Sequence, residues 1–167
     1  GLTSARHDVL SQFIKEKYPE SYDNDLPSEL SYCGSKNLTD KLDGFNIDIG
    51  KMLLSPTRSY APLLKLIFDE IGRNKINGII HCTGGGQTKI LHFIDNLHIL
   101  KNNLFEIPPI FKLIMNESKT DPKEMYKVFN MGHRMEIYLD PENASKVIEI
   151  SKSVGIDAKI IGEVIES

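Results

Sequence analysis

The stretch Asn77-Gly78-Ile79-Ile80-His81-Cys82-Thr83-Gly84-Gly85-Gly86 decides the fold, because a short apolar run ends in three consecutive glycines. The apolar run has the length of a buried strand, and the glycines form a turn signal directly after it. Apolar residues then recur at helical spacing after Gln87. We therefore predict a strand over 77–82, a tight turn at the glycines and a helix that starts near Gln87.

Upstream of this stretch, two apolar helical patterns flank a long polar segment. Apolar side chains share one helical face before Pro19, which ends that helix. The composition then shifts toward Ser, Asp, Asn, Gly and Pro, and so large a loop is unusual inside a compact domain. The elements expected here are a helix over Thr3–Tyr18, a long loop or insertion over residues 20–48 with one short strand near Leu30–Cys33, a strand over Lys51–Leu54 and a helix from Tyr60 to about Arg73.

Downstream, strands and helices continue to alternate. Two helices begin at Asp-Pro pairs, in which the carboxylate can cap the first turn and proline suits the first helical position. The expected elements are strands over Leu97–Leu100, Gly132–Leu139 and Ala158–Ile165, and helices that begin at Pro108-Pro109, Asp121-Pro122 and Asp140-Pro141, the last ending at Gly155. In the strand over Gly132–Leu139, Met135, Ile137 and Leu139 alternate inward. The predicted class is α/β (α+β), a mixed β-sheet flanked by helices in one domain over residues 1–167.

The overall composition excludes several functional classes. The chain has 20 basic and 23 acidic side chains, a net charge of −3, and no Lys/Arg cluster that would indicate binding to nucleic acid. Its apolar runs are far shorter than the roughly 20 residues that cross a membrane, so we expect no membrane span. Two cysteines form no disulfide framework. We therefore expect a cytoplasmic domain.

The glycine loop is the sharpest candidate for a binding site. Glycines let a ligand approach the peptide N–H groups closely, and such N–H groups bind anions such as phosphate. The loop lacks the Gly-Lys-Ser/Thr of a P-loop, and Lys89 stands where a dinucleotide-binding fingerprint needs its last glycine. A tight strand-to-helix turn without a ligand explains the same residues equally well, and both interpretations stay open.

Other candidate residues have ordinary structural alternatives. His81 can donate a hydrogen bond or carry a proton, and Arg58 offers donors that suit phosphate or carboxylate, but a strand-end histidine and a surface arginine are commoner. Asn130 occupies a helix-to-strand junction, where asparagine is frequent for conformational reasons. The histidines and cysteines fit no common zinc spacing, so we expect no metal site. Cys82 is expected to fill the core.

Five segments together resemble the C-terminal domain of the aminoimidazole ribonucleotide synthetase family (phosphoribosylformylglycinamidine cyclo-ligases). Their order and spacing also resemble that family. They are Ser55-Pro56-Thr57-Arg58-Ser59-Tyr60, Ile80-His81-Cys82-Thr83-Gly84-Gly85-Gly86, Pro108-Pro109-Ile110-Phe111, Glu124-Met125-Tyr126-Lys127-Val128-Phe129-Asn130-Met131-Gly132 and Ile161-Gly162-Glu163-Val164.

The resemblance implies an ATP-dependent ring closure in purine biosynthesis. It implies ATP and Mg²⁺ as cofactors, bound mostly by an N-terminal ATP-binding domain that is absent from this chain, and a homodimer for the full-length protein. The isolated domain is then expected to be inactive. The residues carried over are Thr83, Gly84, Gly85 and Gly86 with Thr57 for a substrate or nucleotide phosphate, His81 and Arg58 facing the cleft, and Asn130 in its wall. Relatives have an arginine after the glycine loop, and Lys89 is the candidate replacement here.

Two other functions remain open. The first is a non-catalytic module that binds a phosphorylated metabolite through the glycine loop. The second is another ATP-dependent enzyme of the same superfamily, which the segment Phe129-Asn130-Met131-Gly132 disfavours.

Overall fold

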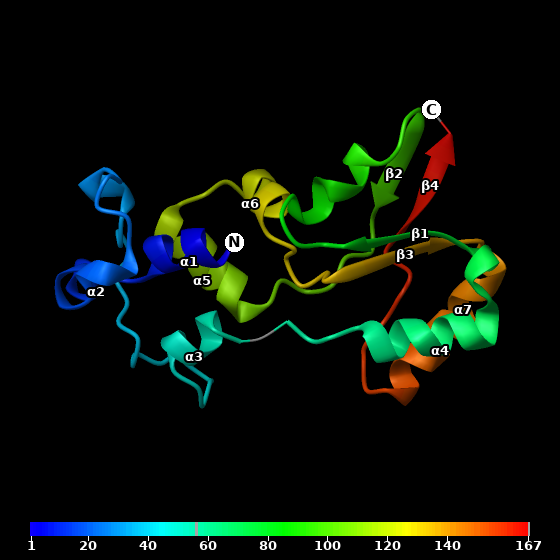
Figure 1. Ribbon diagram of the computed structural model, residues 1–167, viewed down its shortest axis with the longest axis horizontal. Helices are drawn as coiled ribbons and strands as arrows, with labels where there is room; N and C mark the ends of the chain where they lie inside the picture. The colour runs from blue at the N-terminus through cyan, green and yellow to red at the C-terminus, as the bar shows by residue number, and fades with distance from the viewer. Residues whose placement is uncertain (56, 167) are drawn as a thin grey trace.

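The computed structural model describes residues 1–55 and 57–166 and shows two lobes side by side (Figure 1). One lobe consists of helices, and the other combines two β-ribbons with two helices. The helical lobe contains α1 (Leu2–Val9), α2 (Gln12–Lys17), α3 (Ile49–Leu53), α5 (Pro109–Ser118) and α6 (Pro122–Val128). The other lobe contains α4 (Ala61–Ile71), β1 (Ile76–His81), β2 (Leu97–Lys101), β3 (Met135–Leu139), α7 (Pro141–Ser153) and β4 (Gly162–Glu166).

One face of the β1–β3 ribbon is covered by α4 and α7, which pack against each other (Figure 1). The two strands are antiparallel, with His81 opposite Met135. Met135, Ile137 and Leu139 pack against the buried side chains of α4 and α7, so the predicted alternation in this strand is confirmed. The 13-residue α7 is amphipathic, and the apolar stripe that it buries fixes it on this face of the ribbon.

The opposite face of the β1–β3 ribbon is also buried. Ile80, Cys82 and Ile90 form a small core there, with Tyr138 and Ile99 of β2 packed against it. The second antiparallel ribbon, β2–β4, therefore lies across this face. A cleft of about 1020 Å³ runs between the two ribbons. Side chains on both faces of β3 thus contact other elements, and Glu136, between Met135 and Leu139, is buried.

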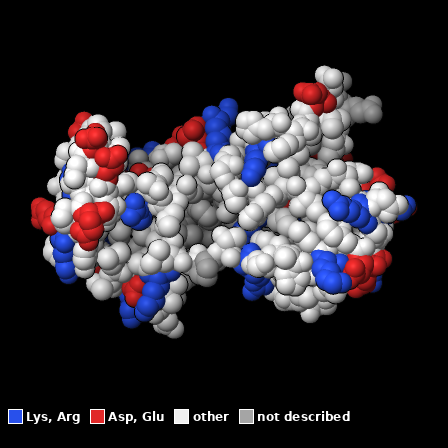
Figure 2. Space-filling model, in the orientation of Figure 1, with Lys and Arg blue, Asp and Glu red and all other residues white. Residues whose placement is uncertain are grey.

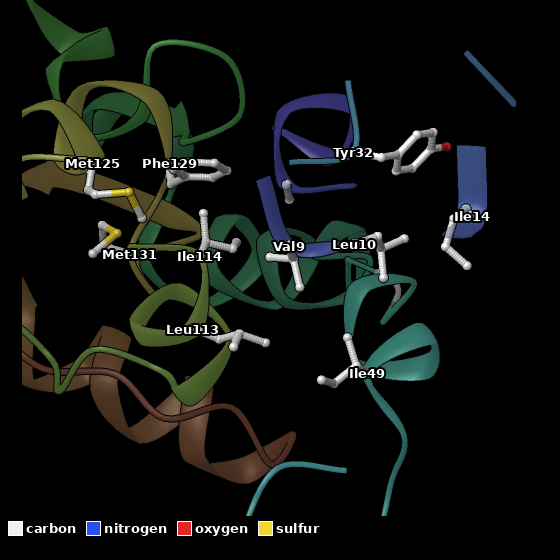
Figure 3. Close-up of a cluster of buried hydrophobic side chains, with 11 residues drawn as sticks. Val9, Leu10, Ile14, Tyr32, Ile49, Leu113, Ile114, Met125, Phe129 and Met131 are labelled. Atoms are coloured by element: carbon white, nitrogen blue, oxygen red, sulfur yellow. The ribbon is translucent and has the colours of Figure 1, made fainter. Parts of the chain in front are cut away.

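The helical lobe has its own apolar core. Figure 3 shows side chains from α1, α3, α5 and α6 converging on it. Its fully or nearly fully buried members include Val9, Ile49, Ile114, Met125 and Met131. Burying one such side chain contributes roughly 1.5–3 kcal/mol. This core holds α6 in place, and α6 in turn supports the glycine loop.

The α+β class is confirmed, although the strands form two separate two-stranded antiparallel sheets and not one mixed sheet. Several elements lie close to their expected places. The helix expected from Tyr60 to about Arg73 is α4, and the strand expected over Leu97–Leu100 is β2. Asp121 caps α6 by accepting a hydrogen bond of 2.9 Å from the Lys123 N–H. Gly155 follows α7 with φ +68°, the left-handed stop expected there.

Three expectations upstream of α4 were wrong. Residues 51–54 lie in and just after helix α3 and not in a strand. The Asp48 side chain caps this helix by accepting a hydrogen bond from the Lys51 N–H, and the helix buries Ile49 and Met52. The region near 30–33 has a 3₁₀ helix over Ser28–Leu30 and no strand. The single helix over 3–18 is divided into α1 and α2.

The break between α1 and α2 has a physical cause. The Ser11 N–H donates to the Lys36 carbonyl at 2.8 Å, and Leu10 forms a parallel bridge with Lys36. The loop over 20–48 is therefore tied back onto the first helix instead of extending away. Within residues 1–55 and 57–166, no helix is both long and apolar enough to cross a bilayer.

Candidate functional site

The loop after β1 is a tight turn that requires glycine at two positions for different reasons. The Gly86 N–H donates to the Thr83 carbonyl at 3.0 Å and closes the turn. Gly85 has φ +91°, a left-handed conformation that disfavours other residues. A Cβ on Gly86 would lie 2.5 Å from the Tyr126 oxygen and 2.6 Å from the Phe129 oxygen, so this glycine lets the loop rest on the end of α6.

Gly84 differs from its two neighbours. Its φ is not positive, a Cβ added to it would meet no atom within 4 Å, and it is exposed. Neither backbone conformation nor packing within the described residues explains a glycine there. A residue without a side chain at this open position would permit close approach of a ligand to the backbone.

Half of the loop amides are used within the protein. The Thr83 N–H donates to the His81 carbonyl at 2.8 Å, and the Gly86 N–H closes the turn. In the described part of the chain, the N–H groups of Gly84 and Gly85 donate to no acceptor. Two neighbouring donors are therefore available to an anion at the exposed tip of the loop.

Lys89 brings a positive charge to the same loop. Its Nζ donates to the Thr83 Oγ1 at 2.9 Å and to the His81 carbonyl at 3.1 Å. An ammonium group has three donors, so one donor remains for a ligand. The Thr83 hydroxyl itself donates to the His81 carbonyl at 3.4 Å. The loop therefore offers two amides and an ammonium, which is a donor set that suits a phosphate group.

A buried polar cluster lies behind the loop. The Lys101 Nζ donates to the Glu136 carboxylate at 2.5 Å, and to the carbonyl and Oε1 of Gln87 at 2.9 and 3.1 Å. The Tyr138 hydroxyl donates to the other Glu136 oxygen at 2.6 Å. The side chains of Lys101 and Glu136 are only 14% and 4% exposed. Removing one partner of such a buried pair costs about 3–5 kcal/mol, because the other charge is left uncompensated.

The buried cluster also affects the titration of its neighbours. Burial, followed by the Glu136 carboxylate, raises the pKa of the Cys82 thiol to about 12. The same two causes raise the pKa of Tyr138. Cys82 is 2% exposed, so the expectation that it fills the core is confirmed. A thiol that stays protonated is a poor nucleophile.

The predicted site residues occupy two separate places. His81 is exposed beside the loop, with its ring edge-on to Tyr60 at 6.3 Å between centroids. The Asn130 carbonyl accepts from the Gln87 Nε2 at 2.8 Å, and its Oδ1 accepts from the Gly132 N–H, so Asn130 shapes the wall under the loop.

Arg58 and Thr57 are not part of this contact set. Arg58 is exposed, and its Nη1 donates to the Gly155 carbonyl at 2.8 Å, beyond the end of α7. Thr57 is also exposed. Pro56, which belongs to the same segment, lies outside the described residues. The roles expected for Arg58 and Thr57 remain predictions.

Sequence reasoning missed Gln87, Lys101 and Glu136. The alternation of Met135, Ile137 and Leu139 gave no reason to expect a buried Glu136, because one buried face is usual for an antiparallel ribbon. Two signals were available. Glu136 is a lone acidic residue within one apolar strand, and Lys101 is a lone basic residue at the end of another. Pairing them requires knowledge of the tertiary arrangement.

The described residues bring together no large group of metal-ligating side chains. Mg²⁺ binds oxygen ligands, usually one or two carboxylates together with substrate phosphates. Among residues 1–55 and 57–166, no group of three or more His, Cys, Asp or Glu side chains gathers where a metal ion could bind. The donor set of the glycine loop fits an anion instead.

Comparison with known proteins identifies the family of this chain. The family described as "AIR synthase related protein, C-terminal domain" matches residues 34–167. The chain is 38% identical over 128 residues to the phosphoribosylformylglycinamidine cyclo-ligase of Methanococcus vannielii, which covers 77% of this chain and 36% of the relative. The proteins of the same name from Methanocaldococcus jannaschii and Thermoanaerobacter sp. are 36% and 33% identical over 78% of this chain, and over 37% and 39% of their own length.

The chain thus spans a little over a third of the length of these curated relatives. The family match contains the glycine loop, α6 and both ribbons. The chain belongs to the AIR synthase related family and carries its C-terminal domain.

Proposed function

We propose that this chain is the substrate-side domain of a phosphoribosylformylglycinamidine cyclo-ligase, and that its glycine loop holds a phosphate group of the substrate or nucleotide. One observation carries the proposal: the N–H groups of Gly84 and Gly85 have no acceptor in the described part of the chain, and the ammonium of Lys89 lies beside them. The names of the relatives supply the reaction.

The proposed reaction closes an imidazole ring in two steps. ATP supplies a phosphoryl group to the amide oxygen of formylglycinamidine ribonucleotide. The amidine nitrogen then attacks the activated carbon, and phosphate leaves. The contribution of this chain is to bind and orient the phosphorylated substrate and to balance its negative charge. His81, exposed beside the loop, is the candidate for a proton transfer or a hydrogen bond to the substrate.

The proposal requires a second domain. Mg²⁺ and most of the ATP would be held by an ATP-binding domain equivalent to the part of the relatives that this chain does not match. Arg58 and Thr57 would then face that domain, and the complete protein would form a homodimer. Cys33 and Cys82 are both free thiols, which suits the reducing cytoplasm.

A titration followed by NMR tests the binding step. We expect formylglycinamidine ribonucleotide to shift the amide resonances of Gly84, Gly85 and Lys89, and the corresponding nucleoside without phosphate to leave them in place. In Lys89→Met, the same shifts should require about 10–100-fold more ligand. The matched control is Lys159→Met, because within the described residues the Lys159 Nζ contacts only neutral groups, at Asn103, Leu104 and the Phe105 ring. Equal responses to nucleotide and nucleoside would contradict the proposal.

A kinetic assay separates catalysis from binding alone. The protein that contains this chain together with its ATP-binding domain should convert formylglycinamidine ribonucleotide to the imidazole product in the presence of ATP, and the chain alone should not. Nucleotide binding without any turnover by the complete protein would instead support a non-catalytic module. Full turnover by the chain alone would contradict the assignment of ATP to a second domain.

A further inference from the structure

We propose that Lys101 and Glu136 are positioning residues that hold the glycine loop in its binding geometry through Gln87. This inference rests on the proposed function, because it concerns the same loop. Neither side chain reaches the exposed tip of the loop, so their effect on a ligand is indirect.

Lys101 forms two hydrogen bonds with Gln87, the first residue after the glycines. Its ammonium donates to both the backbone carbonyl and the side-chain Oε1 of Gln87, and its third contact is the Glu136 carboxylate. The three donors of the lysine are therefore all used. The position of Gln87 relative to the β2 and β3 strands is fixed by one charged group.

Gln87 is held from the other side as well. Its Nε2 donates to the Asn130 carbonyl at 2.8 Å and to the His133 carbonyl at 3.5 Å. The side-chain amide thus has acceptors on its nitrogen and a donor on its oxygen, which fixes its orientation. Gln87 is 8% exposed, so water does not replace these partners freely. The start of the 3₁₀ helix over Gly86–His92 is anchored to two strands and to the turn after α6.

The burial of the pair distinguishes it from the other ion pairs in the described part of the chain. In each of the others, at least one side chain is 36% or more exposed. A buried ion pair often adds no stability over apolar residues of similar volume. Its presence here therefore calls for another role. Beyond Tyr138 and Cys82, the pair contacts Gln87, which it holds through two hydrogen bonds from Lys101.

The glycine loop needs such support. Gly84, Gly85 and Gly86 have no side chains with which to pack, and glycine has the widest conformational freedom of any residue. A loop that must present two amides in a fixed direction is then ordered by its neighbours, here Lys89 on the exposed side and Gln87 on the buried side. Pre-ordering of donors raises affinity, because the loop loses less entropy when the ligand binds.

The test replaces the ion pair with apolar residues of similar size. In the double variant Lys101→Met/Glu136→Leu, we expect the backbone order parameters of Gly84 and Gly85 to fall from about 0.85 toward 0.6. The affinity for ribose 5-phosphate should fall on the order of 10–100-fold. The thermal midpoint should change by only a few degrees. Lys159→Met is the control for loss of a half-buried lysine, and Tyr138→Phe is the control for loss of the tyrosine bond to Glu136.

The outcomes separate this inference from the proposed function. Unchanged order parameters and unchanged affinity in the folded double variant would overturn the inference. If the unaltered chain binds no phosphate but its loop still loosens in the double variant, the positioning role stands and the proposed function fails. Should the double variant not fold, Gln87→Met leaves the ion pair in place and must loosen the loop in the same way; an unchanged loop there would also overturn the inference.

Discussion

The ammonium group of Lys89 donates a hydrogen bond of 2.9 Å to the Thr83 hydroxyl oxygen and so bridges the two ends of the glycine turn. The contact places a positive charge next to the two unpaired amides of Gly84 and Gly85. A phosphate bound there would meet donors on both sides. The family resemblance implied an arginine after this loop, and the geometry shows how Lys89, the fourth residue of the 3₁₀ helix over Gly86–His92, reaches the same turn.

The first prediction concerns this lysine. Lys89→Met should weaken the binding of ribose 5-phosphate about 10–100-fold, since a hydrogen bond to a charged group contributes about 1.5–3 kcal/mol. Isothermal titration calorimetry measures the affinity, and the thermal midpoint should hardly change because the charge is near the surface. Lys89→Arg should keep most of the affinity. Equal affinity of the Met variant and the unaltered chain would remove Lys89 from the site.

The second prediction compares two neighbouring glycines. Gly86→Ala should destabilise the chain by about 1–3 kcal/mol, because a Cβ would press on two backbone oxygens of the α6 end. Gly84→Ala should change stability by less than about 0.5 kcal/mol, because the space around Gly84 is open. Its affinity for phosphate should nevertheless fall. Urea denaturation and phosphate titration of both variants test the contrast, and a Gly84 variant with full affinity would favour the ligand-free turn.

The third prediction concerns Arg58. Arg58→Ala removes one exposed hydrogen bond to the Gly155 carbonyl, so the free energy of unfolding should fall by no more than about 1 kcal/mol. In the complete enzyme we expect KM for the substrate to rise or kcat to fall. Steady-state kinetics and chemical denaturation separate the two effects. Unaltered kinetics would leave Arg58 as a surface residue that stabilises the end of α7.

The fourth prediction concerns acid sensitivity. Burial lowers the pKa of His133 below its usual 6.5, and burial also lowers the pKa of His7. Because the unfolded chain then binds protons that the folded chain does not, stability should fall as the pH drops through 6.5 toward the lowered values. His133 Nε2 accepts from the Phe105 N–H at 3.0 Å, and His133→Gln can supply an acceptor there.

The measurement for this prediction is the thermal midpoint between pH 7.5 and 5. The His133→Gln variant should show a shallower decline than the unaltered chain, and a double variant that also replaces His7 should be shallower still. An identical decline of the thermal midpoint in all three proteins would show that other groups cause the loss of stability at low pH.

The sequence was most informative where the structure is decided locally. Asp121-Pro122 contains both the cap and the first helical residue of α6, and the period of two in β3 identifies the face toward α4 and α7. The glycine turn was also predictable from its residues. In each case the decisive interactions lie within a few positions along the chain.

It was least informative where distant contacts decide. The apolar run over 51–54 suits a strand or a helix, and the cap from Asp48 together with the core of the helical lobe selects the helix α3. The burial of Glu136 was not predictable, because nothing local reveals that Lys101, at the end of β2, pairs with it. The separation of the strands into two ribbons likewise depends on tertiary contacts.

The helical lobe is assembled from discontinuous parts of the chain, and this limits how the protein can be shortened. The family match begins at Gly34, yet Val9, Leu10 and Ile14 belong to the same core as α5 and α6. A recombinant polypeptide trimmed to start at Gly34 would expose that core. The packing that holds α6 would then be weakened, and the glycine turn packs on the end of α6. Deletion designs for crystallography or screening should therefore retain the first two helices.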